Sequence, residues 1–188
     1  MRLLPLLAAL ALPLGACAGM MDDPHAGMVH DRAAVGDFGE ATLKDSGGNR
    51  VGRAVLTQGP TGLLIRIEAT GLAPGWHGVH IHATGQCEAP FTSAGAHINH
   101  ADPKAPHGLL NAEGPDDGDL PNVFADAQGA VNAEVFTTRA RIAAEGPGQW
   151  LWDSDGSALV IHASPDDHST QPIGGAGARV ACGVMAAG

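Results

Sequence analysis

Two histidines separated by one residue stand near the middle of the sequence, in the segment His77-Gly78-Val79-His80-Ile81-His82. Valine and isoleucine alternating with polar residues favour a β-strand, in which successive side chains point to opposite faces. His80 and His82 are therefore predicted to share one face of a strand, with His77 on the other. Imidazole nitrogens on a rigid support suit copper or zinc. Taken alone, a pair at this spacing is more often two surface histidines that only form hydrogen bonds.

More potential ligands follow this histidine strand. The interval from Ala83 to Pro121 has no strand pattern, and loops of that length are commonly functional. His162 ends the apolar run that begins at Ala158, which places a third imidazole at a strand end. A histidine tied to a backbone carbonyl is the alternative for His162 alone. The long interval holds seven side chains of metal-binding type: Cys87, His97, His100, His107, Asp116, Asp117 and Asp119. Together these residues predict a cluster for two metal ions.

Short strands are the elements that must position these ligands. The chain has 188 residues with 27 glycines and 13 prolines, and no long segment has a sustained apolar stripe of helical period. One all-β domain of about eight strands is predicted. Its strands are Phe38 to Lys44, Val51 to Thr57, Leu63 to Ala69, the histidine strand, Val123 to Asp126, Val131 to Thr137, Ala158 to His162 and Arg179 to Val184.

The N-terminal region predicts export. Arg2 precedes the apolar run Leu3 to Leu14, which is too short to span a membrane and is typical of a signal peptide over residues 1–16. Leu14-Gly15-Ala16-Cys17 resembles the lipobox of bacterial lipoproteins, in which the cysteine is acylated; ordinary cleavage after Ala18 is the alternative. Residues 17–36 are predicted to be a flexible tether, although their methionines and histidines leave a copper-loading site open. We expect a periplasmic protein held by a Cys17 lipid, with the outer membrane favoured.

Charge and cysteine content narrow the function further. The net charge of −10 argues against nucleic-acid binding, which needs a basic surface. With Cys17 set aside, Cys87 and Cys182 form an even pair in a compartment that permits disulfides. A bridge between them would close a loop of roughly 95 residues and stabilise the fold by about 4–5 kcal/mol in the chain-entropy model.

Several separated motifs occur in an order that resembles the copper/zinc superoxide dismutases, particularly their exported bacterial branch. The resemblance covers about residues 37–186 and implies an eight-stranded Greek-key β-barrel, an immunoglobulin-like sandwich with long metal-binding and electrostatic loops, for the domain 37–188. The motifs are Gly75-Trp76-His77-Gly78-Val79-His80-Ile81-His82, Cys87, Thr92-Ser93-Ala94-Gly95-Ala96-His97-Ile98-Asn99, Gly118-Asp119-Leu120-Pro121-Asn122, Leu159-Val160-Ile161-His162 and Gly174-Gly175-Ala176-Gly177-Ala178-Arg179-Val180-Ala181-Cys182-Gly183.

The resemblance also implies roles for individual residues. Copper would be held by four histidines: His80, His82, His97 and His162. His97 would bridge copper to zinc, which His107 and Asp119 would also bind. Asp166 would link the histidines of the two sites, Arg179 would attract an anion beside copper, and Cys87 would pair with Cys182. His77 would not be a ligand.

The activity that the resemblance implies is dismutation of superoxide to O₂ and H₂O₂, with copper alternately reduced and oxidised and zinc holding the bridge. One alternative is a copper-binding or copper-delivery protein that keeps the barrel without turnover. Another is an envelope β-sandwich whose histidines are incidental, which the ordered motifs argue against. Superoxide is the expected substrate, any membrane contact is expected only through the N-terminal lipid, and a homodimer remains open.

One position departs from the family pattern. Most relatives carry a further zinc histidine three residues before the ligand aspartate, and here that position is Asp116. Zinc accepts carboxylate oxygen, so we predict Asp116 as the fourth zinc ligand, with His97, His107 and Asp119. A solvated acid in an acidic loop is the alternative. His100 is a weaker substitute, because the turn after His97 is expected to direct it outward.

Overall fold

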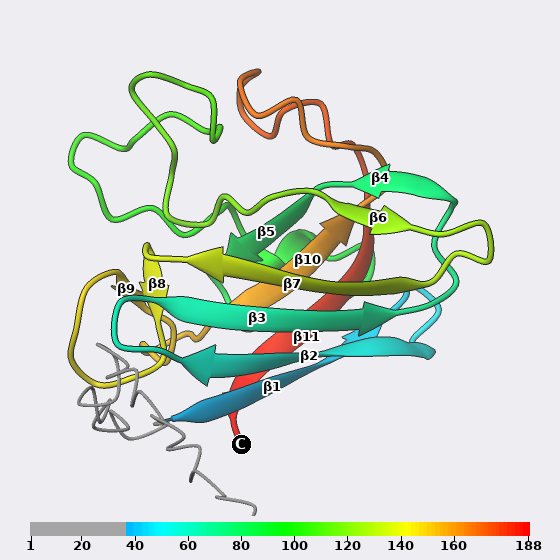
Figure 1. Ribbon diagram of the computed structural model, residues 1–188, viewed down its shortest axis with the longest axis horizontal. Coiled ribbons are helices and arrows are strands. Elements are labelled where there is room, and N and C mark those ends of the chain that lie inside the picture. The colour runs from blue at the N-terminus through cyan, green and yellow to red at the C-terminus, as the bar shows by residue number, and fades with distance from the viewer. Residues whose placement is uncertain (1–36) are drawn as a thin grey trace, which may run out of the picture. The chain divides into compact units, whose positions relative to one another are not determined.

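The computed structural model describes residues 37–188, and the predicted signal peptide, the Cys17 lipid site and the tether lie outside this range (Figure 1). Within the described residues, every regular element is a β-strand except one 3₁₀ turn, η1, at Thr92–Ala94. None of these residues forms a helix long and apolar enough to cross a membrane. The all-β prediction is confirmed.

Seven strands form one curled antiparallel sheet in the order β5-β10-β11-β1-β2-β3-β7 (Figure 1). The first and last strands of the domain are neighbours, and β3 lies beside β7 instead of the next strand along the chain. Such non-consecutive neighbours are typical of Greek-key connections. The strand bounds are β1 Phe38–Lys44, β2 Arg50–Gln58, β3 Leu63–Ala69, β5 Val79–His82, β7 Val131–Thr137, β10 Ala158–His162 and β11 Arg179–Ala187.

Two pairs of short strands complete the fold. Gly75–His77 (β4) pairs with Val123–Ala125 (β6), and Ala140–Arg141 (β8) pairs with Gln149–Trp150 (β9). The described residues thus form eleven strands, where the sequence predicted about eight. Strands β8 and β9 have two residues each, too few to show the alternation on which the prediction depended.

The histidine segment is two strands and not one, which corrects the prediction. The chain leaves the β4–β6 pair and enters the main sheet at Gly78, whose N–H donates to Ser164 O and whose carbonyl accepts from His162 N, both at 2.9 Å. A Cβ at Gly78 would lie 2.9 Å from Ala176 Cβ, closer than side chains pack. The small residue therefore lets the chain change sheets beneath the loop that follows β10.

Alternating burial explains why the main sheet curls around a core. Strand β1 alternates exposed and buried residues along its length, so one of its faces is apolar and packed. Strands β5 and β10 are instead buried at every position. In β5 the apolar residues Val79 and Ile81 join the core, while His80 and His82 point to the opposite face, as the alternation predicted. Loops must cover that second face, since both histidines are fully buried.

Covalent and hydrogen-bonded ties hold the covering loops. Cys87 and Cys182 form a disulfide with their Cα atoms 5.6 Å apart, which confirms the predicted pair and fastens the first loop to β11. Gln171, in the loop after β10, accepts from the backbone N–H of His107 at 2.9 Å and donates to its carbonyl at 2.8 Å. Two loops remote in sequence thereby close over one end of the sheet.

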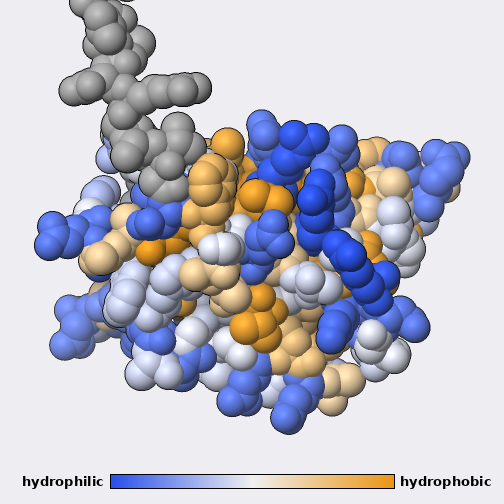
Figure 2. All heavy atoms as spheres, turned by 90° about the horizontal axis from the view of Figure 1, so that it is seen from below, coloured by the Kyte–Doolittle hydropathy of each residue, from blue (hydrophilic) through white to orange (hydrophobic). Residues whose placement is uncertain are grey.

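The outer surface carries scattered apolar side chains. Figure 2 shows apolar residues in orange lying among hydrophilic residues in blue on the face seen from below. Trp76 on β4 and Phe124 on β6 are each more than half exposed and make an edge-to-face pair with ring centroids 5.2 Å apart. Single exposed apolar residues are normal on a folded domain, and here two of them contact each other as an aromatic pair.

Candidate metal centre

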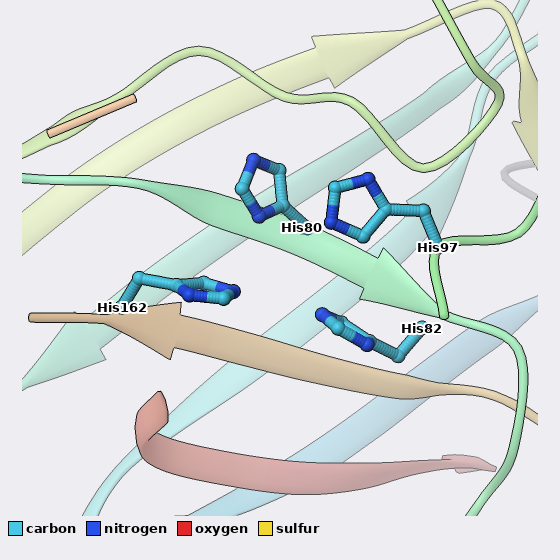
Figure 3. A group of neighbouring side chains, drawn as sticks. All are labelled: His80, His82, His97 and His162. Carbon is cyan, nitrogen blue, oxygen red and sulfur yellow. The ribbon is translucent and has the colours of Figure 1, made fainter. Parts of the chain in front are cut away.

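Four imidazoles meet on the loop-covered face of β5 and β10 (Figure 3). His80 and His82 come from β5, where they pair in register with Val160 and Ala158 of β10, and His162 ends β10. His97 comes from the long loop, which forms an isolated antiparallel bridge with His82. One nitrogen from each of the four rings lies within 4.8 Å of the others.

Each of these four rings has one nitrogen fixed by the protein and one nitrogen without a partner. His82 Nδ1 lies 2.9 Å from Gly95 O, and His162 Nδ1 lies 3.1 Å from Gly177 O. His80 Nε2 lies 2.8 Å from Asp166 Oδ2. The remaining nitrogens are buried and make no hydrogen bond: His80 Nδ1, His82 Nε2, His97 Nε2 and His162 Nε2. Because a neutral imidazole has one N–H and one lone pair, this arrangement presents four lone pairs to one point, which fits copper.

A second cluster adjoins the first on the loop side. It groups His80, His97, His107 and Asp119, again with ligand atoms within 4.8 Å of one another. His107 Nδ1 and Asp119 Oδ1 are buried 2.5 Å apart, and neither atom has another hydrogen-bond partner among the described residues. Asp116 Oδ2 lies 3.0 Å from His97 Nδ1 and 4.0 Å from His107 Nδ1. Imidazole nitrogens and carboxylate oxygens converging in this way form a donor set that suits zinc.

Asp166 connects the two clusters. Its Oδ2 lies 2.8 Å from His80 Nε2 and its Oδ1 lies 3.1 Å from His107 Nε2. Asn122 holds the backbone of Asp166 through two hydrogen bonds, to its carbonyl at 2.8 Å and from its N–H at 2.9 Å. Burial raises the pKa of the Asp166 carboxyl, but the bonds from His107 and His80 outweigh burial and hold the pKa well below its usual range. The carboxylate is therefore ionised and orients one ring of each cluster.

The two clusters differ in electrostatic character. Burial lowers the pKa of His82 to about 2 and that of His162 to about 4, so both rings are neutral near pH 7. Burial also opposes charge on His107, but hydrogen bonds to Asp119 and Asp166 outweigh it and raise its pKa to about 10. The pKa of His97 is raised in the same way by Asp116 and Asp119. The carboxylates thus favour a cation beside His97 and His107, whereas His82 and His162 are neutral ligands.

A cavity of about 540 Å³ opens beside the imidazoles. His82, His97 and Arg179 contribute to its lining, with Lys104 and Gln171 from the two loops. The Arg179 guanidinium donates from Nη1 to Phe91 O at 2.6 Å and from Nη2 to Gly95 O at 2.7 Å. Two carbonyls therefore hold this positive charge at the wall of the cavity next to the imidazole cluster.

The chain matches a known family over most of the described residues. The family model of copper/zinc superoxide dismutase (SODC) matches residues 50–185. The chain belongs to the copper/zinc superoxide dismutase family. It is 50% identical to superoxide dismutase [Cu-Zn] of Caulobacter vibrioides over 146 residues, which are 77% of this chain and 83% of that protein. Copper and zinc are accordingly the metals of the two clusters.

Solved structures of this superoxide dismutase family agree with the observed fold. The Cu/Zn superoxide dismutase from Brucella abortus superimposes with a TM-score of 0.63 at 29% identity, covering 79% of this chain and 99% of that one. A SOD-like protein from Bacillus subtilis superimposes with a TM-score of 0.71 at 35% identity, covering 77% and 95%. The likeness therefore extends over nearly the whole length of both relatives.

The structure brings together His80, His82, His97, His107, Asp119 and His162 in the two clusters, and Asp116 lies beside His97. His77 is buried but lies outside both clusters, with Nδ1 2.7 Å from His162 O and Nε2 2.7 Å from Ala73 O. The His100 side chain is exposed, and its Nδ1 lies 3.9 Å from Asp117 Oδ2. Sequence reasoning missed the supporting roles of Asn122 and Gln171. Asn122 closes one of the quoted motifs, which was a usable signal, whereas nothing in the sequence marked Gln171.

Metal removal should lower stability, because it leaves buried ligand atoms without partners. We expect the chelator-stripped protein to melt at lower temperature and to recover when copper and zinc return. At a hundredfold excess over Kd, binding to the native state adds about 2.7 kcal/mol, or roughly 5–10 °C in a domain of this size. Calorimetry measures the shift, with magnesium as the control ion because it prefers oxygen ligands. An equal shift with magnesium would contradict the nitrogen-rich site.

Proposed function

We propose that the protein dismutates superoxide at a copper ion bound by the four-imidazole cluster. The observation that carries the proposal is the pattern of nitrogens, in which each ring is fixed through one nitrogen and presents the other to a common point. Both the hydrogen-bonded nitrogen and the unpartnered nitrogen are needed. A ring with no hydrogen bond would reorient, and a ring with hydrogen bonds at both nitrogens would have no lone pair for a metal. The proposed copper ligands are His80 Nδ1, His82 Nε2, His97 Nε2 and His162 Nε2.

When bound, copper would exchange one electron with superoxide in each direction, giving O₂ from one molecule and H₂O₂ from the next. The protein must also supply protons to the departing peroxide. His97 is suited to this task because its Nε2 faces the copper cluster while its Nδ1 faces Asp116. A proton held at Nε2 would be within reach of the cavity that His97 lines.

For zinc we propose four ligands, the fourth being an unusual carboxylate. They are His97, His107, Asp116 and Asp119. All four side chains are less than a tenth exposed. The geometry around Asp116 supports this choice, since its Oδ2 lies on the same side of His97 as Asp119 Oδ1, which is 3.5 Å from His97 Nδ1. Zinc would hold the bridging ring without changing oxidation state.

Arg179 would attract the anionic substrate into the cavity. The chain carries a net charge of −10, which repels superoxide at long range. A guanidinium at the cavity wall makes the electrostatic potential positive inside the cavity. The effect acts over distances shorter than the screening length, which is roughly 8–10 Å at physiological salt. Its two carbonyl partners, Phe91 O and Gly95 O, keep it from turning away into solvent.

We also propose export to the periplasm and, after signal cleavage, a lipid on Cys17 that holds the protein at the outer membrane. The lipobox-like Leu14-Gly15-Ala16-Cys17 supports the lipid. A homodimer is proposed as well, because the exposed Trp76–Phe124 pair offers an apolar contact. Mass spectrometry should find an acylated Cys17 as the first residue, and sedimentation should give twice the mass of the mature chain that begins at Cys17. An unmodified N-terminus or a monomer at micromolar concentration would reject the corresponding proposal.

His162→Ala should abolish turnover while leaving the barrel folded, since it removes one of four copper ligands. Loss of an outer-shell partner costs about 10–100-fold in metal affinity, and loss of a ligand should cost at least as much. Superoxide consumption by the copper-loaded variant measures the effect, and circular dichroism checks the fold. His100→Ala is the matched control, because the His100 side chain is exposed. A variant that retains activity would exclude the ligand assignment, and an inactive parent with bound copper would favour a copper-binding or copper-delivery role.

Arg179→Glu should slow the reaction at low salt by about tenfold or more and weaken its dependence on ionic strength. The reason is that attraction between a cation and an anionic substrate becomes repulsion at the cavity wall. Rates measured across a salt series test the effect. Arg66→Glu makes the same change of charge on β3, at a side chain about half exposed and outside the cavity lining. Equal slowing in both variants would show that only total charge matters.

A further inference from the structure

Asp116 contacts Nδ1 of His97, the ring nitrogen that does not face the proposed copper site. The distance from Asp116 Oδ2 to His97 Nδ1 is 3.0 Å, and both side chains are nearly buried. His97 Nε2, on the other side of the ring, is one of the four buried nitrogens of the copper cluster that have no hydrogen-bond partner. Carboxylate, imidazole and copper site therefore stand in sequence.

Peptide groups fix the Asp116 carboxylate. The Gly118 N–H donates to Asp116 Oδ1 at 3.0 Å, while the Asp116 N–H donates to Asp119 Oδ2 at 3.1 Å. Asp119 Oδ2 also accepts from the Gly108 N–H at 2.7 Å. A Cβ at Gly118 would collide with Ile81 O, so the turn packs directly on β5. These bonds need no metal to set the direction of Asp116 Oδ2.

We propose that Asp116 keeps His97 aligned toward copper when zinc is absent, by accepting the His97 Nδ1–H in the place where zinc would bind. This inference rests on the ligand set proposed above. A neutral imidazole that binds copper through Nε2 carries its proton on Nδ1. A carboxylate accepts that proton in a charge-assisted hydrogen bond, about twice as strong as a neutral one, and such carboxylate–histidine pairs fix the orientation of metal-binding rings. Asp116 is thus a positioning residue that makes the copper site independent of zinc.

A neutral histidine at position 116 would act differently. It would have to turn its own lone pair toward His97, and its hydrogen bond would lack the contribution of a full negative charge. The zinc-free state is therefore the condition in which an Asp116→His variant should differ most from the parent.

Asp116→Asn is the sharpest probe because it keeps the shape and removes one acceptor. Two donors, the Gly118 N–H and the His97 Nδ1–H, face the two oxygens of Asp116. An amide has one oxygen and one NH₂ group, so one of these donors would meet another donor. Asp117→Asn is the matched control, since it makes the same change of charge at the next residue, whose carboxylate accepts from the His100 N–H at 2.8 Å.

The experiment uses the purified protein stripped of metal and reloaded with one equivalent of copper, with absence of zinc verified by elemental analysis. Electron paramagnetic resonance counts the nitrogens on Cu(II), and competition with a chelator gives the affinity. We expect four nitrogens in the parent and in Asp117→Asn, matching the four imidazoles. Asp116→Asn should show three nitrogens and a copper affinity lower by about 10–100-fold.

Three results would overturn the inference: three nitrogens in the zinc-free parent, four in zinc-free Asp116→Asn, or equal losses in both variants. The parent measurement alone decides if Asp116→Asn fails to fold. Failure of the proposed function would look different, because the zinc-replete parent would then consume no superoxide or would bind copper through other groups. Zinc content of Asp116→Asn reports its role as zinc ligand separately from its role in the zinc-free state.

Discussion

The centre depends on one buried carboxylate. Asp166 accepts from His80 in the copper cluster and from His107 in the zinc cluster, so a displacement of this side chain would move both. Its surroundings are built to prevent displacement: Asn122 clasps its backbone, and Gly174, at φ +57°, leaves the space that its oxygen fills, where a Cβ would collide. A buried carboxylate is costly unless every oxygen is bonded, and here both oxygens are. The bonds that Asp166 requires thus fix the positions of His80 and His107 relative to each other.

The curled sheet supplies a rigid support with three of the histidines, and the loops supply the remaining ligands and the cover. Strands β5 and β10 are buried on both faces, which lets their histidines sit on a stiff support below a covering of loops. The disulfide ties the first loop to β11, and Gln171 ties the second loop to His107. Arg179 joins the same network through the carbonyls of Phe91 and Gly95. Since Gly95 O also bonds to His82 Nδ1, one peptide group positions both a metal-cluster ring and the cation beside it.

Much of this centre could be predicted from the sequence, because the alternation of side chains along a strand and the order of the motifs are both visible in it. The shared face of His80 and His82 follows from strand alternation alone. The break at Gly78 could not be predicted, since both halves of that segment carry strand-forming residues and only tertiary packing separates them. Partners such as Gly95 O and Gly177 O were also invisible, because every residue has a carbonyl and only the fold selects one. The N-terminal 36 residues lie outside the described structure, and the predictions made for them remain predictions.

The change of sheet at Gly78 places the two halves of one short segment under different structural constraints. After Gly78, every side chain of β5 is buried, either as a histidine of the metal centre or in the core, so no substitution there leaves both undisturbed. Upstream, the outward side of β4 carries Trp76, whose environment is solvent and Phe124 on β6. Substitutions on that outward side can change the surface of the protein without contacting the metal centre. The contact from β4 to His162 is made by His77, whose Nδ1 lies 2.7 Å from His162 O. A boundary of one glycine therefore lets natural variation or protein engineering remodel the surface at Trp76, four residues before the ligand His80.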